Sequence, residues 1–117
     1  MPEGRVPPQS IEAELSVLGS MMLKPAAVSQ AVELLHAEDF NRQAHRAVFE
    51  AMELLLRNGE PVDIVTVTES LKKSGLLEQV GGISFLANLT NTVPSTANLA
   101  HYAKIVKEKA VLRALID

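Results

Sequence analysis

The chain has 117 residues, of which 47% are hydrophobic, and a net charge of −3. It contains no cysteine, which excludes disulfides and thiolate metal sites, and no apolar run approaches the roughly 20 residues that a membrane-spanning helix needs. We therefore predict a single soluble domain with its own hydrophobic core, in a reducing compartment such as the cytoplasm.

The first half of the chain carries three helical signals. Residues 1–9 are predicted to be a flexible or extended lead-in. Ser10 is a good N-cap for a first helix, whose apolar residues recur at helical spacing: Ile11, Leu15, Leu18 and Met22. A second helix is predicted from Pro25 to about Leu35, because proline is favoured in a first helical turn. A third is predicted over 42–57, with Asn41 as its cap and a glycine at its end.

The segment Asp63–Leu71 gives two conflicting signals. The β-branched residues at 64–68 favour a strand by propensity. Asp63 is nevertheless a good helix cap, and the chain offers no second strand to pair with a first one, which would not be stable alone. We predict a helix here, followed by a short helical turn at 76–80.

Residues 81–117 are predicted to form a helical hairpin that follows a globular subdomain of residues 10–80. The first helix of the hairpin spans Ile83–Asn91, Pro94 lies in the turn because proline cannot continue a helix, and the second helix begins at Thr96 or Ala97. The predicted fold class is therefore all-α, a small helical globule followed by a C-terminal helical hairpin.

The last helix has two apolar stripes, whereas a surface helix of a monomer needs only one. One stripe comprises Ile105, Leu112 and Ile116. The other consists mainly of small residues, which permit a neighbouring helix to approach closely. We expect one stripe to pack on helix 83–91 and the other to lie bare and meet a second copy of the chain. The predicted self-association face is the second stripe with its edge: Leu99, Tyr102, Ala103, Val106 and Ala110.

The sequence predicts no catalytic, cofactor or metal site. It contains no G-x-x-x-x-G-K-S/T segment for binding a nucleotide phosphate. His36, Glu38 and Asp39 lie close together, but for so short a motif a capped helix end is a much commoner interpretation than a metal site. The basic residues of the last helix are interpreted as solvated flanks or, alternatively, as ion-pair partners of an acidic neighbour: Lys104, Lys107, Lys109 and Arg113.

Direct binding of nucleic acid is expected to be weak. Up to residue 60 the chain has five Lys or Arg against nine Asp or Glu, and aromatic residues make up only 3% of the whole. Phosphate binding depends largely on Lys and Arg, and single strands are commonly held by stacking on aromatic rings. A small DNA-binding regulator remains the alternative class of function. Its recognition helix would be Asp63–Gly75, where only Lys72 and Lys73 supply positive charge.

A series of short segments, in order along the chain, carries a resemblance to a known family. They include Pro7-Pro8-Gln9-Ser10-Ile11-Glu12-Ala13-Glu14, Asp39-Phe40, Ala44-His45-Arg46, Gly59-Glu60-Pro61-Val62-Asp63, Val80-Gly81-Gly82 and Val93-Pro94-Ser95. Together they resemble the N-terminal domain of bacterial replicative DNA helicases of the DnaB type, from about residue 5 to the end.

The resemblance implies a helical collar domain in a hexameric ring, in which the domains associate as a trimer of dimers. The ATPase motor, which uses ATP and Mg, would follow after a linker, so the chain is expected to be a fragment without enzymatic activity. The family's collar docks the helicase-binding domain of primase and, in some members, a helicase loader. The positions associated with primase docking match Glu12, Phe85 and Ile116. Phe85 stands where relatives often carry tyrosine.

Overall fold

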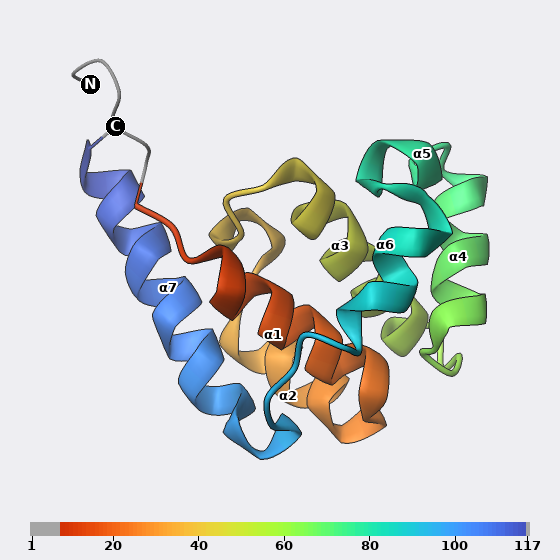
Figure 1. Cartoon of the computed structure of the whole chain (residues 1–117), viewed down its shortest axis with the longest axis horizontal. Helices are drawn as coiled ribbons and strands as arrows, with labels where there is room; N and C mark the ends of the chain where they lie inside the picture. Colours follow the sequence, from red (N-terminus) through yellow and green to blue (C-terminus); the bar gives the residue numbers. More distant parts are fainter. Residues whose placement is uncertain (1–7, 117) are drawn as a thin grey trace.

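The computed structural model describes residues 8–116, and this part of the chain is built from helices without a strand (Figure 1). The all-α class is thus confirmed. Residues 1–7 of the predicted lead-in lie outside the described residues. In chain order the elements are α1 (Ile11–Leu23), α2 (Pro25–Leu34), the 3-10 turn η1 (Ala37–Asp39), α3 (Gln43–Arg57), α4 (Ile64–Lys73), α5 (Leu77–Val80), α6 (Gly82–Leu89), the 3-10 turn η2 (Thr96–Asn98) and α7 (Leu99–Ile116).

Two of the predicted N-caps are present. The Ser10 hydroxyl accepts a hydrogen bond from the backbone N–H of Ala13, with 3.2 Å between the two atoms. At the start of α4, the Asp63 carboxylate accepts from the Thr66 N–H at 2.9 Å, and the Thr66 hydroxyl accepts from the Asp63 N–H at 3.0 Å. This reciprocal cap satisfies two backbone donors that a helix end leaves free. It helps the β-branched segment to form the predicted helix.

The predicted cap of α3 is wrong. The helix begins at Gln43, and the cap position is Arg42, whose side chain makes no capping bond. Asn41 is instead held against α1, because its backbone N–H donates to the Glu14 carboxylate at 2.8 Å and its side-chain amide donates to Gln9. A buried carboxylate needs such donors, and this need outweighs the local preference of asparagine for a cap.

Helix α1 lies at the centre of the molecule, in contact with α2, α3, α6 and α7. It is mostly apolar and buried from Ala13 to Met22. Gly19 is needed where α1 meets the end of α6, because a Cβ added there would lie 2.5 Å from the carbonyl oxygen of Leu89 and 2.3 Å from Val93. Elsewhere in the core, the rings of Phe40 and Phe49 are both fully buried and pack with their centroids 5.0 Å apart.

Both helices of the predicted hairpin are present, with a turn between them, but their packing differs from the expectation. Helix α6 contacts α1, α4 and α5, whereas α7 contacts α1, α2 and η1. Figure 1 shows α1 between α7 on the left and α6 on the right. The expectation that one stripe of the last helix packs on helix 83–91 is therefore corrected, because α1 is the main partner of α7.

Candidate protein-interaction site

One face of α7 is buried in the chain's own core. Leu99, Ala103 and Val106 are only 1%, 2% and 1% exposed, and Tyr102 and Ala110 are half-buried. The small side chain of Ala103 lets α7 come close to the globule. The expectation that this stripe lies bare in a monomer is therefore wrong. The close approach that its small residues permit is made to α1 and α2 of the same chain.

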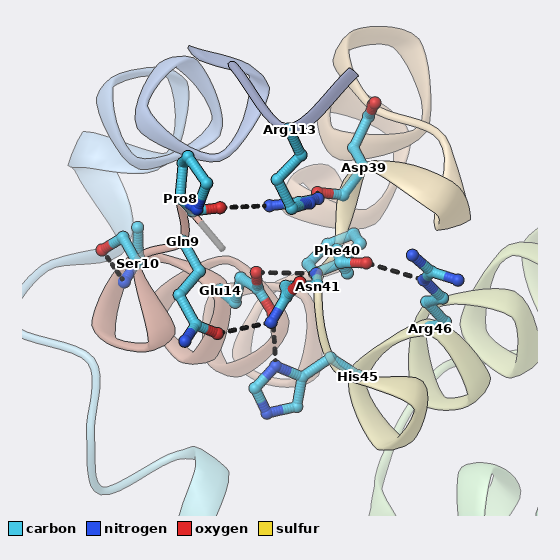
Figure 2. A network of polar contacts seen from close by, with 11 residues as sticks. Pro8, Gln9, Ser10, Glu14, Asp39, Phe40, Asn41, His45, Arg46 and Arg113 are labelled. Carbon is cyan, nitrogen blue, oxygen red and sulfur yellow. Dashed lines mark hydrogen bonds and ion pairs between the residues drawn. The ribbon is translucent and has the colours of Figure 1, made fainter. Parts of the chain in front are cut away.

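Two basic residues fasten the second half of α7 to the globule. Lys107 Nζ lies 2.8 Å from Asp39 Oδ2. Arg113 donates to two backbone carbonyls, of Pro8 at 2.9 Å and of Asp39 at 2.6 Å (Figure 2). Asp39 is buried and also accepts from the backbone N–H of His36 at 2.8 Å. The segment around Asp39 is thus a capped turn. Of the two interpretations of the basic residues, Lys107 follows the second, because it pairs with an acidic neighbour. We call this set of contacts the α7 clamp.

The end of α7 exposes a concentrated apolar surface. Among the described residues, nine large hydrophobic side chains are exposed, and four of them lie within the last six residues of this helix: Val111, Leu112, Leu115 and Ile116. Leu115 is the most exposed of the four, at 77%. We call these four residues the α7 tip. Contiguous exposed apolar surface of this kind usually marks an interaction site.

A groove with a volume of about 570 Å³ adjoins the α7 tip, between α7 and Leu34 at the end of α2. Its apolar lining includes Ala100, Ala103 and Leu112, and its polar lining comes from Lys104, Lys107 and Glu108. Grooves between helices that combine an apolar floor with a few polar groups are typical binding sites for a partner helix.

A buried polar network joins α1 to α3 (Figure 2). Glu14 and His45 are 1% and 3% exposed, and Glu14 Oε1 lies 2.7 Å from His45 Nδ1. The other carboxylate oxygen accepts from the Asn41 N–H at 2.8 Å. Both oxygens of this buried acid therefore have a partner, as burial requires. The imidazole ring in turn stacks on Phe85 of α6, with centroids 5.9 Å apart and an angle of 14° between the planes.

The three residues that the family resemblance predicts for primase docking come from three different elements. Glu12 is exposed on the first turn of α1 and lines a groove of about 350 Å³ with Tyr102 and Ile105 of α7. Phe85 is half-buried on α6 beside His45. Ile116 lies at the α7 tip and is 56% exposed.

Other classes of site find no support in residues 8–116. No group of three or more His, Cys, Asp or Glu there is placed to hold a metal ion. None of the helices described is both long and apolar enough to cross a membrane. Helix α4 buries Val67 and Leu71 against the core, and Lys72 lies 3.5 Å from the carboxylate of Glu69. This partial neutralisation does not favour a phosphate-binding recognition helix.

Comparison with known proteins gives a consistent result. Residues 6–108 match the family described as DnaB-like helicase N terminal domain. The chain is 53% identical over 112 residues to Replicative DNA helicase DnaC of Bacillus subtilis (strain 168), and 54% identical over 112 residues to Replicative DNA helicase DnaB of Geobacillus stearothermophilus. Each alignment covers 96% of this chain and 25% of the relative, so the chain spans a quarter of the length of these relatives.

The fold also matches a solved structure, the N-terminal domain of DnaB helicase from Mycobacterium tuberculosis. The TM-score is 0.92 at 47% sequence identity, and the match covers 95% of this chain and 80% of the other. A likeness at this level of identity agrees with the sequence matches in both fold and family.

Proposed function

The chain belongs to the family of DnaB-like helicase N-terminal domains, and from this premise we propose that it is the assembly and protein-interaction domain of a replicative DNA helicase. In this proposal the domain associates with copies of itself to form the collar of a hexameric ring in the cytoplasm. It also docks the helicase-binding domain of primase and, in some settings, a helicase loader. ATP, Mg and the unwinding activity belong to a motor elsewhere in the full-length enzyme.

The observation that carries the proposal is the α7 tip, with its exposed apolar surface beside the clamp. Lys107 and Arg113 fix the helix on the globule through η1 and Pro8. The apolar residues beyond the buried stripe therefore project from a fixed base. A surface of this kind is suited to protein partners, since exposed aliphatic side chains gain free energy when a partner removes them from water.

We expect the chain to form a concentration-dependent dimer, rising to a hexamer in the full-length protein, and the substitution Leu112→Glu to shift it to a monomer. Leu112 is 45% exposed, so the change leaves the core intact, but it places a charge where the second copy needs an apolar contact. Light scattering coupled to size exclusion measures the effect. The matched control is Leu54→Glu on α3, where the leucine is 48% exposed. A wild-type monomer at high concentration contradicts the assembly proposal.

We also expect Phe85→Ala and Ile116→Ala each to weaken binding of the primase helicase-binding domain, by about 2 kcal/mol where the side chain is a central anchor. The expected cause is the loss of an apolar contact that the partner buries. Isothermal titration calorimetry with the folded variants measures the affinity. The control is Val65→Ala on α4, where the valine is 67% exposed. Unchanged affinity in both variants would contradict the proposed docking residues.

A further inference from the structure

The starting observation is the position of His45, which touches both a buried acid and a half-exposed aromatic ring. One edge of the imidazole bonds to Glu14, and one face lies against Phe85 with nearly parallel planes. The centroid separation of 5.9 Å falls within the range at which aromatic rings attract each other. His45 thus connects the buried network to a residue on the proposed docking surface.

The contact with Glu14 in the core fixes the orientation of the imidazole. Glu14 is 1% exposed and is itself held by the Asn41 N–H at 2.8 Å. The 2.7 Å contact between Glu14 Oε1 and His45 Nδ1 therefore ties the imidazole to a carboxylate that is itself held in place. Turning the ring would break this hydrogen bond inside the core. Nδ1 of His45 and Oε1 of Glu14 would then lack a partner, which would cost free energy because both atoms are buried.

The main chain before α6 also lies close to Phe85. Gly81, immediately before α6, has a φ of +113°, and a Cβ added there would lie 2.9 Å from the Cβ of Phe85. The main chain at Gly81 therefore lies close to the base of the Phe85 side chain, while the imidazole lies against one face of its ring. The rest of the ring is half-exposed.

We propose that His45 is a positioning residue for Phe85, so that the buried Glu14–His45 pair presents the Phe85 ring in one orientation to a docking protein partner. The inference rests on the proposed docking function. A side chain that is already ordered before binding loses less conformational entropy in the complex. Loss of the imidazole should then weaken docking about three- to tenfold, although His45 itself is buried and touches no partner.

The test is a double-mutant cycle with His45→Asn and Phe85→Ala, measured by calorimetry with the primase helicase-binding domain. Asparagine places an amide N–H near the position of Nδ1, so the bond to Glu14 is kept while the ring is removed. We expect His45→Asn to weaken binding about three- to tenfold in the wild-type background. In the Phe85→Ala background it should have no further effect. His101→Asn, at an exposed histidine of α7, is the control.

The outcomes separate this inference from the proposed function. Weakening by Phe85→Ala with no effect of His45→Asn overturns the positioning role and leaves docking at Phe85 intact. An equal effect of His45→Asn in both backgrounds overturns it too, because the effect would not pass through Phe85. Neutral Phe85→Ala overturns docking at that residue, and the positioning role with it.

A measurement on the unmodified protein keeps the inference testable if His45→Asn fails to fold. Three-bond couplings in nuclear magnetic resonance report the χ1 rotamers of Phe85 without any partner. We expect one dominant rotamer in the wild type and several in folded His45→Asn. Averaging over several rotamers in the wild type would overturn the proposal whatever the variants do.

Discussion

Replacing Glu14 with alanine is expected to lower the free energy of unfolding by about 2 kcal/mol or more, because each buried hydrogen-bonding group left without its partner costs about 1–3 kcal/mol. The substitution leaves His45 Nδ1 and the Asn41 N–H without an acceptor inside the protein. It also removes the link between α1 and the segment before α3. Chemical denaturation followed by circular dichroism measures the change, since a single small domain is expected to unfold in one step.

The matched control is Glu12→Ala, because Glu12 is also a glutamate and lies on the same helix as Glu14. Glu12 is exposed, so its removal should change the free energy of unfolding by no more than about 0.5 kcal/mol. If both variants lose equally little, the buried network contributes nothing beyond an ordinary surface contact, and our account of why Asn41 is drawn away from the helix cap fails.

Replacing Ala103 with glutamate is expected to lower the free energy of unfolding by about 3 kcal/mol or more, because a charge would enter the core without a partner. Ala103 is 2% exposed and lies where α7 meets the globule. From the sequence alone, this residue is expected to face a second copy, so the same change should leave the monomer folded. The structure reverses that expectation.

Ala100→Glu serves as the control, since Ala100 lies one turn earlier on α7 and is exposed. Thermal unfolding at low protein concentration, where dimers dissociate, should show Ala100→Glu close to wild type and Ala103→Glu melting far lower. A stable, monomeric Ala103→Glu variant would contradict the burial of this face. Such a result would support the prediction from the sequence that the stripe containing Ala103 contacts a second copy of the chain.

Local signals account for the parts of the fold that the sequence predicted well. Ser10 and Asp63 cap helices at the expected places. Pro94 lies in the turn before η2, and α2 begins at Pro25. Each of these features depends on residues within one helical turn of each other, so that no knowledge of distant contacts is needed to find them.

Features that depend on distant residues were not predictable in this way. The Glu14–His45 pair joins residues 31 apart, and Arg113 reaches back 105 residues to Pro8. Nothing near either residue marks its partner. The two stripes of α7 illustrate the same limit, because helical periodicity shows that two apolar faces exist but not which one meets α1. The docking roles proposed for Glu12 and Phe85 come from the family resemblance, because neither periodicity nor spacing indicates them.

The α7 clamp has a mechanical consequence. Because Arg113 binds the main-chain carbonyls of Pro8 and Asp39, its grip does not depend on the side chains at those two positions. Lys107 adds a second contact about 1.7 turns earlier in the helix. The second half of α7 is therefore held against the globule at two separate points along its length. When a partner binds the α7 tip, we expect α7 to stay docked on the globule, so that the two move together.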